Sequence, residues 1–230
     1  MRLDRFLGRH GVHSSKEISR LLADQQVAVD GEIETNGIRK INRFSKIELE
    51  REILQEHEAV YIMLHKPAGY LSATTDLQYP TVIELIDHPL RDELHLAGRL
   101  DRTSTGLLLL TNDGRWSKRV TEPTEKIPKI YRVTTRDIIV ADTTSIFAAG
   151  IYFAYENLTT RPALLEILAE REARLTIYEG RYHQVKRMFH SVGNQVLSLH
   201  RESIGPFVLD SSLPSGKFRH LSPTEVACFI

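Results

Sequence analysis

The chain has 230 residues, of which 41% are hydrophobic, and its 30 basic and 30 acidic residues give a formal net charge of zero. The single cysteine, Cys228, excludes an internal disulfide, and no apolar run approaches the roughly 20 residues that span a bilayer. With a charged N-terminus and no recognisable signal peptide, these features predict a cytoplasmic protein without a membrane partner, long enough for one large domain or two smaller ones.

The basic residues are unevenly distributed along the chain although the net charge is zero. Residues 1–46 hold nine Lys and Arg against six Asp and Glu, residues 115–136 hold seven against two, and residues 171–201 hold six against two plus three histidines. Separate basic patches on a neutral protein are typical of one that binds a polyanion at defined places. Ordinary segregation of charge on a solvated surface is the alternative.

The first part of the chain predicts two short helices and a hairpin. Leu3, Phe6 and Leu7 have the i, i+3, i+4 spacing of an apolar helix face. Residues 14–17 form a capping box that opens a second helix. Residues 27–33 predict a strand, an Asp-Gly turn and a second strand.

Basic residues of these two helices fall opposite the apolar faces at about 100° per residue. They are Arg2, Arg5, Arg9, Lys16 and Arg20. Two adjacent helices could present them to phosphate groups, although surface helices place charge outward in any protein. The acidic residues 47–60 predict a last strand and a linker, with a domain boundary near residue 58.

Beyond this boundary, predicted strands outnumber predicted helices. The strands are 61–65, 107–112, 129–136, 163–169, 173–178 and 196–204. The helices are 142–149, 181–192 and one opened by a capping box at 222–225. Turns are predicted at 66–69 and at Asp113-Gly114. Because strands and helices do not alternate regularly, we expect an α+β fold with a mainly antiparallel mixed sheet flanked by helices.

The most specific motif places one carboxylate, Asp101, between Arg99 and Arg102 in a loop that leads into the apolar strand at 107–112. Its sequence is Gly-Arg-Leu-Asp-Arg-Thr-Ser-Thr-Gly-Leu-Leu-Leu-Leu-Thr. A second motif, at 179–188, reads Glu-Gly-Arg-Tyr-His-Gln-Val-Lys-Arg-Met. Together the two motifs resemble the signatures of the pseudouridine synthase family, most closely those of members that act on 16S rRNA. Residues 1–46 resemble the S4-type RNA-binding domain found at this end of such proteins.

The resemblance implies an S4-like RNA-binding domain with its linker at 1–58 and a catalytic domain at 59–230. It implies isomerisation of uridine to pseudouridine in ribosomal RNA, either free or in a pre-ribosomal particle. The reaction needs no cofactor, metal or small-molecule cosubstrate. We expect the protein to act as a monomer.

In the family, one aspartate carries the chemistry, and here its position is that of Asp101. The ionised carboxylate attacks either C1′ of the ribose or C6 of the uracil, and the sequence leaves this choice open. A cation beside the carboxylate keeps it ionised. The resemblance gives this role to Lys186, where the family often has arginine, and helical geometry places Lys186 beside the apolar face of its helix. Arg187 is the fallback partner.

The remaining site residues follow from the same resemblance. Tyr131 should lie against the target uracil, on the strand face that it shares with Lys129 and Val133. Arg99 should bind phosphate or fill the gap left by the flipped base, and Ile177 should pack against the base. Substrate contacts are also expected from Arg181, His183 and Arg187. For most of these positions, the alternative is an ordinary role in the core or on the surface.

Two other functions remain open at this point: a large-subunit (23S) rRNA pseudouridine synthase, and a non-catalytic RNA-binding or ribosome-assembly protein. Other chemistries have less support. Ser104 does not lie in a Gly-x-Ser-x-Gly elbow, and the histidines lack the spacing of a metal site. No phosphate-binding loop or dinucleotide fingerprint is present.

Overall fold

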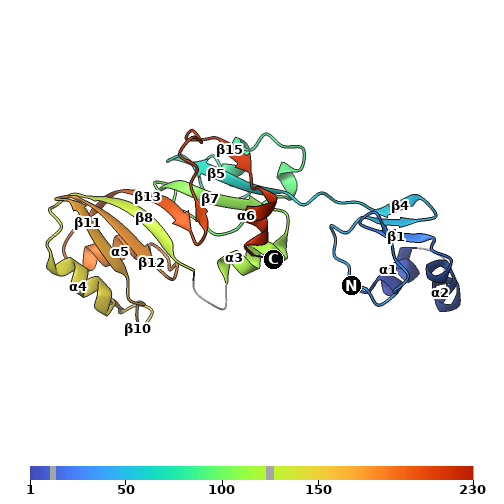
Figure 1. Ribbon diagram of the computed structural model, residues 1–230. Helices are drawn as coiled ribbons and strands as arrows, with labels where there is room; N and C mark the ends of the chain where they lie inside the picture. The colour runs from blue at the N-terminus through green and yellow to red at the C-terminus, as the bar shows by residue number, and fades with distance from the viewer. Residues whose placement is uncertain (11–13, 123–126, 230) are drawn as a thin grey trace. The chain divides into compact units, whose positions relative to one another are not determined.

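The computed structural model describes residues 1–10, 14–122 and 127–229 and divides into two compact units, Met1–Ala59 and Val60–Ile230 (Figure 1). Part of the basic stretch 115–136, namely residues 123–126, lies outside the described residues. Within the described ranges, no helix is long and apolar enough to cross a bilayer.

The first unit packs two helices, α1 (Leu3–His10) and α2 (Ser15–Ala23), against a four-stranded antiparallel sheet of order β2-β1-β3-β4. The strands are β1 (Val27–Val29), β2 (Glu32–Ile33), β3 (Ile47–Leu49) and β4 (Glu52–Gln55). The predicted capping box of α2 is confirmed, because Ser14 Oγ accepts from the Glu17 amide at 3.3 Å and Glu17 accepts from the Ser14 amide at 3.4 Å. The predicted apolar face of α1 is buried in the core of this unit.

The prediction of a single strand within 47–60 is wrong. This stretch contains β3 and β4, which form a hairpin that turns at Glu50 and Arg51 with φ angles of 50° and 73°. Such left-handed turns usually carry glycine or asparagine. Two charged residues therefore gave no turn signal in the sequence.

The second unit is built on a nine-stranded sheet with the order β11-β12-β8-β13-β7-β5-β15, to which β14 and β6 add at β13 and β7. The longer strands are β5 (Tyr61–Lys66), β7 (Thr105–Thr111), β8 (Lys129–Thr135), β11 (Leu164–Ala169), β12 (Glu172–Ile177) and β13 (Val196–Ile204). The short ones are β6 (His95–Leu96), β14 (Phe207–Val208) and β15 (Phe218–His220), and a separate pair is formed by β9 (Tyr152–Phe153) and β10 (Leu158–Thr159). Among the strands of the described residues, only β7 and β13 pair in parallel, which confirms the mainly antiparallel mixed sheet.

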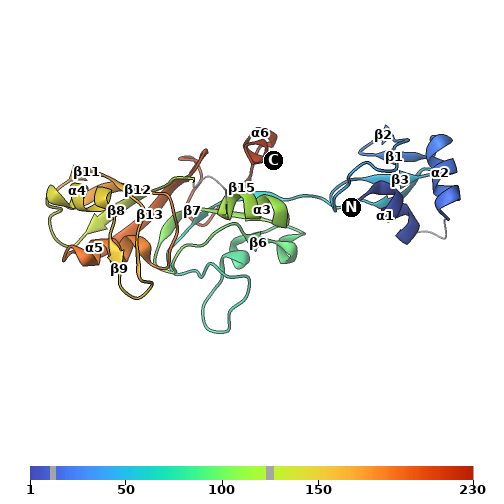
Figure 2. The ribbon, with the colours of Figure 1, turned by 90° about the horizontal axis from the view of Figure 1, so that it is seen from below.

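Helices flank this sheet. They are α3 (Gly114–Thr121), α4 (Asp142–Ala149), α5 (Gln184–Ser191) and α6 (Pro223–Ala227), with 3₁₀ turns η1 (Val82–Leu85) and η2 (Arg91–Glu93). The helices α4 and α5 lie against one face of the β11-β12-β8-β13 half, where Phe147 and Phe189 meet edge to face (Figures 1 and 2). In contrast, β5 and β7 are buried on both faces. This explains the unbroken leucine run of β7.

The parallel contact between β7 and β13 requires a glycine. Gly106 has a φ of 108°, and a Cβ atom at this position would lie 2.3 Å from the Arg201 carbonyl oxygen. Only a residue without a side chain allows the two strands to approach this closely. Gly106 therefore fixes the start of β7, immediately after the loop that carries Asp101.

One predicted turn is in fact the start of a helix. Asp113 caps α3, since its carboxylate accepts from the amides of Arg115 at 2.9 Å and Trp116 at 3.2 Å. The aspartate of an Asp-Gly pair serves equally well in a turn and as an N-cap. The burial of Trp116 in the core of this unit explains why the helix forms here.

Candidate active site

The loop between β6 and β7 is held to the rest of the unit through its backbone. Ser72 Oγ donates to the Leu100 carbonyl at 2.7 Å and accepts from the Leu100 amide at 3.0 Å, and the Gly69 amide donates to the Arg102 carbonyl at 2.8 Å. Within the loop, the Ser104 amide donates to the Asp101 carbonyl at 3.0 Å. These bonds fix the backbone on which the Asp101 side chain stands.

The carboxylate of Asp101 meets two basic side chains from the 183–186 segment. Lys186 Nζ lies 2.8 Å from Oδ2, and His183 Nε2 lies 3.2 Å from Oδ1. Lys186 also donates to Thr103 Oγ1 at 3.2 Å. The carboxylate retains 26% of its side-chain exposure, so it is ion-paired and still open to a ligand.

The geometry of α5 explains why Lys186 reaches Asp101 and Arg187 does not. Val185, Met188 and Phe189 are buried in the core, which puts Lys186 at the flank of the helix, as predicted. Arg187 instead makes two bonds of 2.6 Å to the carboxylate of Glu156. Its guanidinium also lies 3.7 Å from the centroid of the Phe153 ring. The fallback assignment of Arg187 as the partner of Asp101 is therefore wrong.

A cavity of about 310 Å³ opens beside this ion pair. Its wall includes the side chains singled out in the sequence, namely Arg99, Asp101, Tyr131, Ile177, Arg181, His183 and Lys186. Tyr131 and Ile177 are nearly fully buried, at 6% and 2% exposure. The arrangement thus combines an ion-paired carboxylate, an aromatic ring and an apolar wall around a space large enough for a small ring.

Two buried cations beneath the loop were missed by the sequence analysis. Lys66, the last residue of β5, is fully buried. Its Nζ lies within 2.8–3.3 Å of the carbonyl oxygens of Ser104, Pro67, Asp101 and Arg102. The sequence indicated only a Pro/Gly turn here. The available signal was a lysine at the end of a strand, directly before a proline.

Arg201 is the second buried cation. Its Nε donates to the Leu107 carbonyl at 2.8 Å and its Nη1 to the Arg99 carbonyl at 3.1 Å. Within the part of the chain that the structure describes, its Nη2 is buried without a hydrogen-bond partner. Arg201 and Lys66 therefore contact carbonyl groups along the whole loop from Arg99 to Leu107.

Burial lowers the pKa of Lys66 to about 8, and the positive charges of Arg201 and Arg102 act in the same direction, whereas the charge of Asp101 opposes the shift. At neutral pH the lysine still carries its proton, since the pH lies below this value. The ammonium group can then donate to three of the surrounding carbonyl oxygens at once.

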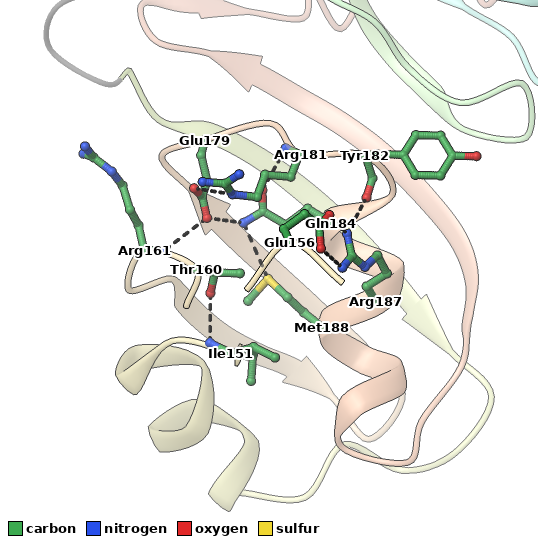
Figure 3. A network of polar contacts seen from close by, with 10 residues as sticks. All are labelled: Ile151, Glu156, Thr160, Arg161, Glu179, Arg181, Tyr182, Gln184, Arg187 and Met188. Carbon is green, nitrogen blue, oxygen red and sulfur yellow. Dashed lines mark hydrogen bonds and ion pairs between the residues drawn. The ribbon is translucent and has the colours of Figure 1, made fainter. Parts of the chain in front are cut away.

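A polar network behind the cavity holds the segment that carries His183 and Lys186 (Figure 3). Glu179 accepts from the Arg161 amide, from Arg181 Nε and from Gln184 Nε2 at 2.9–3.0 Å. Gln184 in turn accepts from the Arg181 amide at 3.0 Å. Arg181 is therefore tied to Glu179 at the rim of the cavity.

The predicted basic residues of the first unit are all exposed: Arg2, Arg5, Arg9, Lys16 and Arg20. Arg2 pairs with Asp4, and Arg20 pairs with Asp24 at 3.3 Å. Ion pairs this exposed contribute little to stability. These side chains therefore remain available to a polyanion.

Among the described residues, no group of three or more His, Cys, Asp or Glu side chains could hold a metal ion.

Comparisons with known proteins identify the family of the chain. The sequence model described as RNA pseudouridylate synthase matches residues 60–191. A protein of Pseudomonas aeruginosa named ribosomal small subunit pseudouridine synthase A is 48% identical over 227 residues, which cover 98% of this chain and 99% of that protein. The protein of the same name from Escherichia coli K12 is 42% identical over the full length of both. A crystal structure described as a pseudouridylate synthase superimposes with a TM-score of 0.72 at 41% identity over the whole of both chains.

Proposed function

Because the chain belongs to the RNA pseudouridylate synthase family, we propose that it converts a uridine of small-subunit (16S) ribosomal RNA to pseudouridine, with Asp101 as the catalytic residue. Full-length relatives are named for the small subunit. The observation that carries the proposal is the Asp101–Lys186 ion pair of 2.8 Å in the wall of the cavity.

The reaction breaks the bond between uracil N1 and ribose C1′ and joins C1′ to C5 of the same base. N1 gains a proton, and C5 loses one to the solvent. Asp101 attacks either C1′ or C6, and both steps need an ionised carboxylate. Lys186 favours that form through its opposite charge. No atom is lost to a second substrate, so the proposed reaction needs neither a cosubstrate nor a redox cofactor.

Tyr131 and Ile177 would hold the extruded base. Stacking on an aromatic ring is worth about 1–3 kcal/mol per base, which can offset the few kcal/mol that extrusion costs. Both residues are buried in the wall of the cavity that Asp101 shares. Arg99 and Arg181, from the same wall, would bind the phosphates on either side or fill the space that the base leaves.

The basic residues of the first unit would deliver RNA to the catalytic unit, in the manner of an S4-like domain. Its two helices and four-stranded sheet form a separate hydrophobic core. Its cations Arg5, Arg9 and Lys16 are exposed. We place the enzyme in the cytoplasm, as a monomer that acts on ribosomal RNA or on a pre-ribosomal particle.

Action on 23S rRNA is the second candidate, since the chemistry would be the same. A purely RNA-binding role is less well supported, because a binding protein has no need of an ion-paired carboxylate in a cavity. Perturbed or paired titratable groups in a cavity are typical of active sites.

Tritium release decides between these functions. We expect the enzyme to release tritium from 16S rRNA fragments labelled at C5 of uridine, because the isomerisation must expel this hydrogen. Fragments of 23S rRNA serve as the control and should release none. Tritium release from 23S rRNA alone would show that the large-subunit RNA is the substrate. Release from neither RNA would contradict the enzymatic function.

Replacing basic residues of the first unit should weaken RNA binding by a salt-dependent amount. We expect Arg5→Ala/Arg9→Ala to reduce the slope of log K against log salt concentration by about one to two, because each lost phosphate contact changes the slope by about 0.7–0.9. Filter binding at several salt concentrations measures this slope. The matched control is Arg91→Ala/Lys217→Ala, two exposed cations of the catalytic unit outside the basic stretches of the sequence. An unchanged slope in the first variant would exclude the delivery role for these two arginines.

A further inference from the structure

An exposed aromatic stack lies at the rim of the cavity. The rings of Tyr182 and His183 are parallel within 18°, with centroids 3.9 Å apart. His183 lines the cavity and contacts Asp101. Tyr182 is outside the lining and is 76% exposed. One face of the tyrosine ring is covered by the histidine, and the other face remains open to solvent.

The backbone creates this arrangement. His183 has a φ of 49° and a ψ of 29°, the left-handed region that residues with side chains rarely adopt. With this conformation, the backbone changes direction immediately before α5 begins. It lets His183 turn toward Asp101 while Tyr182 points outward, away from the Glu156–Arg187 pair in Figure 3. Backbone conformations of this kind gather at binding and catalytic sites.

The surrounding network holds the backbone of the segment that carries the stack. The Arg181 amide is bound by Gln184, and the Tyr182 carbonyl accepts from Arg187 Nη1 at 3.4 Å. Arg187 is itself held by Glu156. The backbone that carries the Tyr182 ring is therefore held by hydrogen bonds. Binding a ligand on the open face of the ring then costs little backbone entropy.

We propose that the Tyr182 ring is a stacking subsite for the nucleobase that neighbours the target uridine in the RNA, an inference that rests on the proposed function. His183 lines the cavity beside Asp101 and Tyr182 stacks on His183, so a nucleotide next to the target base that leaves the cavity past His183 meets the open face of the Tyr182 ring. A flat aromatic face accepts any base, because every base has a π-face. The subsite thus recognises an unpaired nucleobase by stacking, and Tyr131 and Tyr182 hold two successive bases.

The kinetic consequence is a change in KM without a change in kcat. We expect Tyr182→Ala to raise KM for a 16S rRNA fragment about 5- to 150-fold, the range that corresponds to the loss of one stacked base. Tyr182→Phe keeps the ring and should restore the wild-type KM. Tyr155→Ala is the matched control, because Tyr155 is 96% exposed and is outside the lining of the cavity. The salt slope of binding should stay unchanged in all three variants, since stacking releases no counterions.

An RNA without the neighbouring base identifies the ligand. Once the modified uridine is mapped, wild type and Tyr182→Ala are compared on RNAs with an abasic residue on the 5′ or the 3′ side. On one of the two sides, the abasic site should raise KM for wild type by the same factor as Tyr182→Ala does, with little further effect in the variant. Equal effects of the abasic site on wild type and variant at both positions would overturn the subsite. If wild type releases no tritium at all, the proposed function fails instead.

Discussion

We expect Asp101→Asn to lower the rate of tritium release at saturating RNA by at least about 10⁴-fold, the scale of loss when a catalytic nucleophile is removed. Asparagine has the shape of aspartate but carries no charge and cannot attack C1′ or C6. The backbone bonds of the loop to Ser72, Gly69 and Lys66 do not involve the Asp101 side chain. The variant should therefore fold normally and retain its affinity for RNA.

The control for this variant is at Asp113, which follows β7, the strand that begins after the Asp101 loop. Asp113→Asn also replaces an aspartate by its amide, yet Asp113 caps α3 and is not part of the cavity wall. Asparagine is as good an N-cap as aspartate, so this variant should keep the wild-type rate. Single-turnover measurements on 16S rRNA fragments compare the two directly. Residual activity of Asp101→Asn above a hundredth of wild type would exclude Asp101 as the nucleophile.

Lys66→Met lowers both stability and turnover. Methionine fills a similar volume but donates no hydrogen bond to the four carbonyl oxygens that surround Nζ. Because buried acceptors left without a donor are costly, we expect the free energy of unfolding to fall by about 2–4 kcal/mol. Two of these carbonyls belong to Asp101 and Arg102, so the loop that carries Asp101 should move. A displacement of about 1 Å can reduce the rate about 10²-fold.

Urea unfolding measures the loss of stability. Single-turnover tritium release measures the loss of rate, at a temperature at which the variant is folded. Met63→Leu, at another fully buried position of β5, is the control, since volume-conserving core changes usually cost less than about 1.5 kcal/mol. It should leave the rate unchanged. A folded Lys66→Met enzyme with the wild-type rate would show that Lys66 does not position Asp101.

Elements with strong local signals were predictable from the sequence. The capping box at Ser14 and the apolar run of β7 each depend on residues close together in the chain, and the structure confirms both. The hairpin at Glu50 and the start of α3 at Asp113 were not predicted. The hairpin was missed because its turn carries two charged residues with left-handed φ angles, and the start of α3 because the burial of Trp116, a tertiary contact, selects a helix at the Asp-Gly pair.

By itself, the sequence predicted which side chains carry the proposed chemistry, because Asp101 and Lys186 lie in motifs with a fixed spacing and Tyr131 lies on a strand whose alternation sets its face. It also determined the sheet class, since alternation and turn signals are local. Only the tertiary structure decided which cation meets Asp101, because the burial of one face of α5 turns Lys186 toward the loop and Arg187 toward Glu156. The structure also showed Lys66 and Arg201 beneath the loop. These residues are 35 and 100 positions from Asp101 in the chain, and no local pattern encodes contacts over that separation.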